Sequence, residues 1–124
     1  MQKLTGSPAQ RKGNRYEALA CRYLQNAGLK LVTRNYRARC GEIDLIFHDG
    51  GTLVFVEVRF RTDPDFGMAF ETVTFYKQQR IKRTALLYLQ ANRLTDKIPC
   101  RFDVVGINRK GSGLNCRWIK SAFS

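Results

Sequence analysis

The sequence predicts a single α/β domain in which helices flank a mixed β-sheet, with elements in the order α-β-β-β-α-β-β. Residues 8–27 and about 73–92 have apolar residues at helical spacing, and residues 41–61 have the pattern of a β-hairpin. The 124 residues suffice for one domain with a hydrophobic core, and an apolar fraction of 44% is typical of a folded protein. We therefore expect residues 1–124 to form one domain, with residues 1–7 flexible.

The first helix is predicted to begin at Pro8. Ser7 can act as its N-cap, Pro8 suits the first helical position, and Gln10 completes a capping box. Apolar side chains then recur at helical spacing: Tyr16, Leu19, Ala20, Tyr23, Leu24 and Ala27. Gly28 is expected to end the helix, because glycine readily adopts the left-handed conformation found at helix C-termini.

Glu17 lies at the border of the apolar stripe of this helix. Its carboxylate is expected either to face the surface on which the helix packs or to stay exposed and pair with a neighbour such as Arg22. The helical spacing alone does not choose between these two placements.

A short strand is predicted at residues 29–36, and a basic cluster of Arg34, Arg37 and Arg39 overlaps its end beside Tyr36. Arginine and tyrosine together suit contact with phosphates and stacking on bases. A solvated hairpin turn explains the same cluster equally well.

The hairpin at residues 41–61 is predicted to turn at Gly50 and Gly51, which stand between two apolar runs. If these glycines are the two loop residues, Asp49 pairs with Thr52, and the register of every further pair follows.

Continued along the strands, this register places Asp44 opposite Glu57 and Glu42 opposite Arg59. All four side chains then share one face of the sheet, because strand side chains alternate with a period of two. Directly opposed Cβ atoms lie about 5 Å apart, where two carboxylates repel each other. A positive charge is therefore expected between Asp44 and Glu57, supplied either by a divalent cation or by a basic side chain.

A second helix is predicted over about residues 73–92, after a loop at 62–70 that contains Pro64 and Gly67. Its core stripe consists of Ile81, Ala85, Tyr88 and Leu89. Lys77 lies beside that stripe near the helix start and could reach back toward the acidic face of the hairpin. Arg80, Lys82 and Arg83 form a more outward basic rim, which a solubilising helix face would also explain.

The C-terminal part predicts a strand at residues 98–107, a turn at 108–113 and a short final strand at 114–119. A helical crossover of about 20 residues precedes the first of these strands. Such a crossover favours a parallel arrangement with the second strand of the hairpin.

Charge and cysteine usage limit the function classes. Lys and Arg total 22 against 10 Asp and Glu, a net charge of +12, which favours a polyanionic partner: nucleic acid first, an acidic membrane surface second. A merely basic soluble protein is the alternative. The N-terminus has no signal-peptide pattern and no run could span a bilayer, so we expect a cytoplasmic protein without a membrane partner. The four cysteines form no C-x-x-C pair, which argues against a zinc site and for reduced thiols.

Several separated motifs occur in the order of a known family: Glu17 in the first helix, GEIDLI at 41–46, FVEV at 55–58, FG at 66–67, Lys77, and RFDVV at 101–105. Together with the spacing Asp-x12-Glu-x-Arg and the element order, they resemble the PD-(D/E)xK nuclease superfamily over nearly the whole chain. More narrowly, the chain is similar to the YraN-like predicted endonucleases, which are related to archaeal Holliday-junction resolvases.

The resemblance implies a restriction-endonuclease-like core in which Asp44 and Glu57 bind Mg²⁺, with Mn²⁺ able to substitute. It also makes the main-chain carbonyl of Val58 a ligand and Glu17 a further carboxylate. The position two residues after the Glu is usually Lys, and here it is Arg59. Arginine keeps a charge for the phosphate but cannot transfer a proton, and Lys77 is the nearest substitute for that role.

Three functions follow as hypotheses. The first is a Mg²⁺-dependent endonuclease acting on DNA rather than RNA, including branched or structured DNA, with Glu42 as a supporting residue. The arginines expected to bind nucleic acid are Arg34, Arg37, Arg39, Arg61, Arg80 and Arg83. The second is a non-catalytic nucleic-acid-binding module with a degenerate nuclease core. As a structural alternative to the metal, Glu42 with Arg59, and Asp44 or Glu57 with Lys77, would form a buried ion-pair network. The third is a scaffold for acidic proteins. The resolvase resemblance also suggests a homodimer.

Overall fold

The computed structural model describes residues 8–61 and 73–124. Their elements follow the predicted order: α1 (Pro8–Asn26), β1 (Lys30–Ala38), β2 (Gly41–Asp49), β3 (Thr52–Arg61), α3 (Phe75–Ala91), β4 (Cys100–Lys110) and β5 (Gly113–Phe123). The predictions for residues 1–7, including Ser7 as N-cap, and for the loop at 62–70 lie outside the described residues. The predicted fold class, an α/β domain with a mixed sheet, is confirmed.

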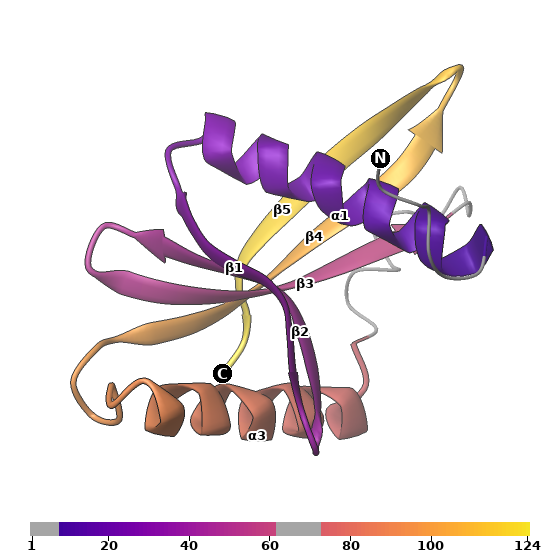
Figure 1. Ribbon diagram of the computed structural model, residues 1–124. Coiled ribbons are helices and arrows are strands. Elements are labelled where there is room, and N and C mark those ends of the chain that lie inside the picture. Colours follow the sequence, from indigo (N-terminus) through magenta and orange to yellow (C-terminus); the bar gives the residue numbers. More distant parts are fainter. Residues whose placement is uncertain (1–7, 62–72) are drawn as a thin grey trace, which may run out of the picture.

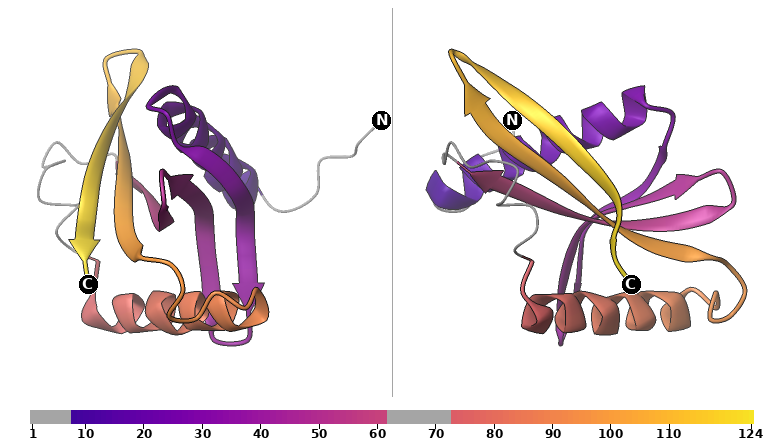
Figure 2. Two further views of the ribbon diagram at one scale, coloured as in Figure 1. Left: turned by 90° about the vertical axis from the view of Figure 1, so that its left-hand side faces the viewer. Right: turned by 180° about the vertical axis from the view of Figure 1, so that it is seen from behind.

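The five strands form one sheet in the order β1-β2-β3-β4-β5. Neighbouring strands are antiparallel except β3 and β4, which are parallel, as the helical crossover between them predicts. Figures 1 and 2 show α1 on one face of the sheet and α3 on the other. The sheet is therefore covered on both faces along its centre, which accounts for the near-continuous apolar runs of β2 and β3.

Two hydrophobic clusters, one on each face, hold the helices to the sheet. The cluster under α1 contains Tyr16, Ala20, Cys21, Leu24, Leu29, Leu45, Phe47, Val54, Val56, Val105 and Ile107. The cluster under α3 contains Ile43, Ile46, Leu53, Phe55, Ile81, Ala85 and Tyr88. Each fully buried Leu, Ile or Phe in these clusters stabilises the fold by about 1.5–3 kcal/mol relative to exposure. The predicted stripe of α3 is thus buried, with Leu89 partly buried at its border.

The C-terminus of α1 has the predicted glycine in a left-handed conformation. Gly28 has φ +103°, its amide donates to the carbonyl of Gln25 at 3.0 Å, and the amide of Leu29 donates to the carbonyl of Leu24 at 3.1 Å. This pair of hydrogen bonds is the Schellman arrangement, which satisfies carbonyls that the ending helix leaves free. It turns the chain directly into the buried Leu29 and β1.

The second hairpin is longer than predicted. Pairing between β4 and β5 continues to Lys110↔Gly113, so the turn is shorter than the predicted 108–113, and β5 runs on to Phe123 instead of ending at 119. Gly111 supplies the positive φ of +60° that a tight turn needs. Polar side chains on an exposed arm carry no hydrophobic alternation, so the sequence pattern of this stretch is that of a loop.

The four cysteines are free thiols. Among the described residues, no helix is long and apolar enough to cross a membrane.

Candidate active site

A cavity of about 150 Å³ lies where β2 begins, against β3 and the first half of α3. It is lined by Gly41, Glu42, Asp44, Glu57, Lys77, Arg80 and Ile81. The structure therefore brings together three of the predicted acids and two of the predicted basic residues. Glu17, Arg59 and the arginines of β1 do not line this cavity.

Asp44 marks the point at which β2 separates from β3. The predicted register is confirmed from Asp49↔Thr52 to Leu45↔Val56, and the extrapolated partners of Asp44 and Glu42 fall beyond this paired stretch. Instead, the carboxylate Oδ2 of Asp44 accepts a hydrogen bond from the amide of Val58 at 2.8 Å. The side chain of Asp44 thus accepts the hydrogen bond that a main-chain carbonyl of β2 would otherwise accept from β3. Asp44 and Glu57, on the two separating strands, both line the cavity.

Beyond this point β2 stays paired with β1. Glu42 pairs with Arg37 in the ladder, and the Nε of Arg37 lies 3.5 Å from Oε2 of Glu42. Arg59, predicted to oppose Glu42, pairs in its backbone with Gly106 of the parallel strand β4. The Arg37–Glu42 ion pair is well exposed, so it contributes little to stability.

Asp44 lies in an environment that favours its neutral form. Burial, together with the nearby charge of Glu57 and, more weakly, that of Glu17, raises the pKa of Asp44 to about 8. The Val58 amide and Lys77 act in the opposite direction because they stabilise the carboxylate. The expectation that the opposed acids need a positive charge is thus supported by the electrostatics of the site.

Lys77 supplies such a charge. Its Nζ lies 2.6 Å from Oε1 of Glu57, whose side chain is only 7% exposed, whereas the lysine is half-exposed. The prediction that Lys77 reaches back to the acidic face is confirmed. Thr74 is the N-cap of α3 and accepts a hydrogen bond from the Lys77 amide at 3.1 Å, which fixes the helix turn that carries this lysine.

Glu17 belongs to the other helix and lies within electrostatic reach of the same acids. Burial raises its pKa, as do the charges of Glu42 and Glu57, while a hydrogen bond from the Asn35 side chain lowers it. Of the two placements left open by the sequence, the half-buried one facing the sheet is the one observed.

Asn35, the partner of Glu17, was not predicted as a site residue. It has a left-handed φ of +52°, and it falls between the ladder pairs Arg34↔Leu45 and Tyr36↔Ile43, opposite Asp44 in that register. Asparagine tolerates this conformation better than most residues. An Asn inside a predicted strand is the signal in the sequence that could have identified the irregularity.

The donor set of the cavity fits a hard divalent cation. Mg²⁺ takes one or two carboxylates and keeps several waters, and Asp44 and Glu57 are two carboxylates at one cavity. Within residues 8–61 and 73–124, no group of three His, Cys, Asp or Glu side chains is arranged to hold a metal. A site here would therefore rely on the carboxylate pair, water and main-chain oxygen.

The predicted nucleic-acid-binding arginines whose side chains are described are all exposed: Arg34, Arg37, Arg39, Arg80 and Arg83. The side chain of Arg61 lies outside the described part. Arg80 also has a structural contact, because its Nε donates to the carbonyl of Cys40 at 3.3 Å and so joins α3 to the β1–β2 turn. In that turn Gly41 has φ +154°, and a Cβ there would approach the hydroxyl of Thr84 to 3.0 Å. A side chain at this position would therefore be strained by the backbone conformation and crowded by Thr84.

Two exposed aromatic residues at the start of α3 were missed. Phe75 and Tyr76, in the first turn of α3, are 74% and 71% exposed. The guanidinium carbon of Arg80 lies 5.9 Å from the centroid of the Tyr76 ring, within cation–π range. The sequence signal was available, because Phe-Tyr stands next to Lys77 but off the apolar stripe of the helix.

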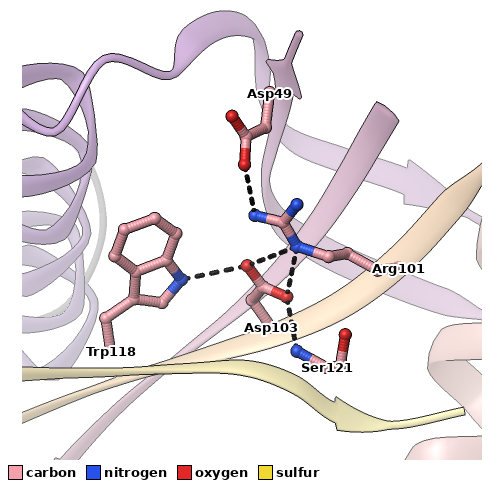
Figure 3. Close-up of polar contacts among 5 residues, drawn as sticks. All are labelled: Asp49, Arg101, Asp103, Trp118 and Ser121. Carbon is pink, nitrogen blue, oxygen red and sulfur yellow. Dashed lines mark hydrogen bonds and ion pairs between the residues drawn. The ribbon is translucent and has the colours of Figure 1, made fainter. Parts of the chain in front are cut away.

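A second polar cluster proves to be structural (Figure 3). Asp103, fully buried, accepts hydrogen bonds from Arg101 Nε, Trp118 Nε1 at 2.9 Å and the Ser121 amide at 2.9 Å. Arg101 also contacts Asp49 at 2.8 Å, which joins β4 to the end of β2. The run at 101–105 that contributed to the family resemblance thus anchors β5, whose register shifts opposite Asp103.

Comparisons with other proteins agree on one family. The model described as "Uncharacterised protein family UPF0102" matches residues 16–107. A UPF0102 protein of Coxiella burnetii is similar to this chain at 51% identity over 117 residues, which cover 94% of this chain and 95% of that protein. UPF0102 proteins of Stutzerimonas stutzeri and Legionella pneumophila are 46% and 45% identical, over 94% and 92% of this chain and 98% and 95% of their own lengths.

Proposed function

The chain belongs to the UPF0102 family, and from the geometry of its cavity we propose that it hydrolyses phosphodiester bonds of DNA with a divalent metal ion. The observation that carries this proposal is the juxtaposition of Asp44 and Glu57, two largely buried acids that share one cavity with Lys77. Two such acids destabilise each other unless a cation compensates them. The resemblance to the PD-(D/E)xK nucleases, which is part of this proposal, implies that the cation is a metal ion that assists phosphodiester hydrolysis.

In this proposal Asp44 and Glu57 hold Mg²⁺ or Mn²⁺, the main-chain carbonyl of Val58 is a further ligand, and Glu17 supports the site from α1. When bound, the metal supplies charge neutralisation at the phosphate and a more acidic water. The amide of Val58 keeps Asp44 in place through its 2.8 Å hydrogen bond to Oδ2. Glu42 adds negative charge at the rim of the cavity, where it is exposed to solvent.

The basic residues divide into two roles. Lys77 stands in for the motif lysine beside the acids, and a bound metal would compete with it for its 2.6 Å contact with Glu57. Arg59 stands where the superfamily usually has Lys, and its guanidinium is suited to grip a phosphate but not to transfer a proton. Exposed arginines on β1 and α3 would hold the nucleic-acid backbone: Arg34, Arg37, Arg39, Arg80 and Arg83.

A cleavage assay tests the proposal. Purified protein is incubated with single-stranded, duplex and four-way DNA, and with RNA, in Mg²⁺ or Mn²⁺ and in EDTA. We expect metal-dependent cleavage of at least one DNA substrate, reduced in Asp44→Asn and Glu57→Gln by more than the roughly 10- to 100-fold that loss of an outer-shell partner of a metal ligand costs. Asp96→Asn, which changes an exposed loop acid, is the matched control and should retain activity. Folded protein that cleaves no substrate would refute hydrolysis.

A second function is favoured by one observation. Because Lys77 already neutralises Glu57 at 2.6 Å, the chain could bind nucleic acid around an ion-paired core without catalysis. Calorimetric titration of Mg²⁺ and Mn²⁺ separates the two functions. Binding to wild type that is lost in Glu57→Gln supports the metal site. Heat changes absent from both, together with salt-sensitive nucleic-acid binding, identify the non-catalytic module.

A further inference from the structure

The first turn of α3 presents an aromatic surface that the fold does not use. Phe75 and Tyr76 are 74% and 71% exposed, although aromatic side chains of this size are usually at least partly covered. They are adjacent in the sequence, and they precede the buried stripe of the helix, which begins at Ile81. Their exposure therefore contributes nothing to the core under α3.

Tyr76 connects this surface to the candidate active site. Lys77, the next residue, contacts Glu57 in the cavity. Arg80 lines the cavity and places its guanidinium carbon 5.9 Å from the centre of the Tyr76 ring. Arg80 thus contacts the Tyr76 ring and also lines the cavity.

The chemistry around the rings selects the partner. Aromatic faces alone would suit any apolar group, but here Tyr76 lies beside Arg80 and is followed by Lys77, on a protein of net charge +12. Flat apolar faces beside cations match a chain of bases and phosphates. Bases inside a duplex are stacked on one another and cannot lie flat on a protein side chain, whereas unpaired bases can.

We propose that Phe75 and Tyr76 form a stacking platform for unpaired bases, and that the preferred ligand is single-stranded nucleic acid or a structure with unpaired bases beside the bond to be cut. The proposal deepens the function proposed above by naming the substrate class. It rests on that function for catalysis, but not for binding. A base stacked on Tyr76 would place the neighbouring phosphate near Arg80 and the cavity.

The test measures binding in EDTA, where no metal-dependent cleavage takes place. Fluorescence anisotropy compares single-stranded and duplex oligonucleotides of equal length, for wild type and for the double variant Phe75→Ala/Tyr76→Ala. We expect the variant to lose roughly 5- to 150-fold in affinity for the single strand, the range found when a stacked base loses its aromatic partner. Affinity for the duplex should stay within about twofold, and the salt dependence should not change because no phosphate contact is removed.

Two further variants make the result specific. Leu86→Ala removes another exposed apolar side chain from the same helix and should change neither affinity. Tyr76→Phe keeps the ring and should bind as wild type does. A single strand that contains 2-aminopurine reports stacking directly, since its fluorescence should be quenched by wild type and less by the double variant. Equal losses for single strand and duplex, or no loss at all, would overturn the proposal.

Sedimentation velocity tests the alternative that a second copy of this chain, not nucleic acid, binds to Phe75 and Tyr76. If wild type is a dimer and the double variant a monomer, the aromatic pair is an interface and the platform is refuted. The proposal also fails separately from the catalytic one. Absent cleavage with intact single-strand discrimination leaves the platform standing, whereas cleavage of single strands that is unchanged in the double variant refutes the platform and leaves hydrolysis standing.

Discussion

Asp44 connects the charge of the site to the stability of the fold. Its pKa is about 8 in the folded protein, against an ordinary value of 3.8, so between these two pH values the folded state holds a proton that the unfolded chain has released. Folding then takes up a proton, and the free energy of unfolding falls as the pH rises through this window. The buried carboxylate is tolerated best when acid protonates it or a cation approaches it.

Asp44→Asn tests this directly, because asparagine resembles the protonated acid. In EDTA we expect the variant to be more stable than wild type at pH 8 by several kcal/mol, with a difference that shrinks by about 1.4 kcal/mol per pH unit and vanishes only as the pH falls below the ordinary value of 3.8. Urea unfolding across this pH range measures it. A difference that is constant with pH would mean that the shift of the pKa is absent. Asp96→Asn, on an exposed loop, should show no such trend.

Lys77 is the cation that the structure provides for Glu57. Lys77→Met keeps much of the apolar stem but leaves the Glu57 carboxylate, 7% exposed, without its partner at 2.6 Å. We expect a loss of about 1–3 kcal/mol at pH 7.5, below the cost of breaking a fully buried pair because the lysine is half-exposed.

The same variant distinguishes the metal site from a permanent ion pair. If Mg²⁺ and Lys77 compete for the acids, Mg²⁺ should raise the melting temperature of Lys77→Met more than that of wild type. Lys82→Met, on the same helix but not lining the cavity, should respond as wild type does. If the metal stabilises none of the three proteins, the acids bind no metal.

The sequence predicted where some residues of the cavity lie but not others, and the difference has a physical reason. Asp44, Glu57 and Lys77 follow from local periodicity, because two strands joined by a tight turn and one helix turn fix their directions. The contact of Asp44 with the Val58 amide ends the ladder, so positions extrapolated past it, such as Glu42 opposite Arg59, are not ladder pairs. Tyr76 lies off the apolar stripe of its helix, so the helical pattern predicts that its ring is exposed but assigns the ring no role.

At the scale of elements, the site depends on β2 serving two partners. Its turn-proximal half pairs with β3, while its first half pairs only with β1, and the irregular residue Asn35 lies opposite the point of change. The first hairpin and the parallel crossover were predictable, because apolar runs and a helix of sufficient length specify them. The length of β5 was not predictable, because the strand is held by the buried Asp103 through contacts with Trp118 and Ser121 that no local sequence pattern encodes.

Asn35 should stabilise β1 in two separable ways, through its tolerance of φ +52° and through its hydrogen bond to Glu17. Asn35→Ala loses both and should cost about 1–2 kcal/mol in the free energy of unfolding. Asn35→Gly loses only the hydrogen bond and accepts the backbone conformation, so it should cost less. Urea unfolding measures both variants. Equal costs would mean that the backbone conformation contributes nothing.

At the scale of the whole molecule, exposed basic residues lie at two distant ends. Arg37 and Arg39 lie at the β1–β2 turn, next to the cavity and α3, whereas Arg109 and Lys110 lie at the tip of the β4–β5 hairpin (Figures 1 and 2). Both pairs are exposed, and both contribute equally to the net charge of +12. If net charge alone attracted a polyanion, both ends would contribute equally to its binding. If the polyanion binds at the cavity, the end next to the cavity should contribute more.

Charge removal at each end therefore locates the nucleic acid. If phosphates bind beside the cavity, Arg37→Ala/Arg39→Ala should lower the slope of log affinity against log salt by about 1.4–1.8, the value for two lost phosphate contacts on single or double strands. Arg109→Ala/Lys110→Ala removes the same charge from the far end and should leave the slope nearly unchanged. The Arg37–Glu42 ion pair does not confuse this comparison, because both partners are more than half exposed and their pairing adds little to stability. Equal changes for the two variants, measured by anisotropy over a salt series, would mean that the protein binds nucleic acid through its overall charge, without using the cavity end as its binding surface.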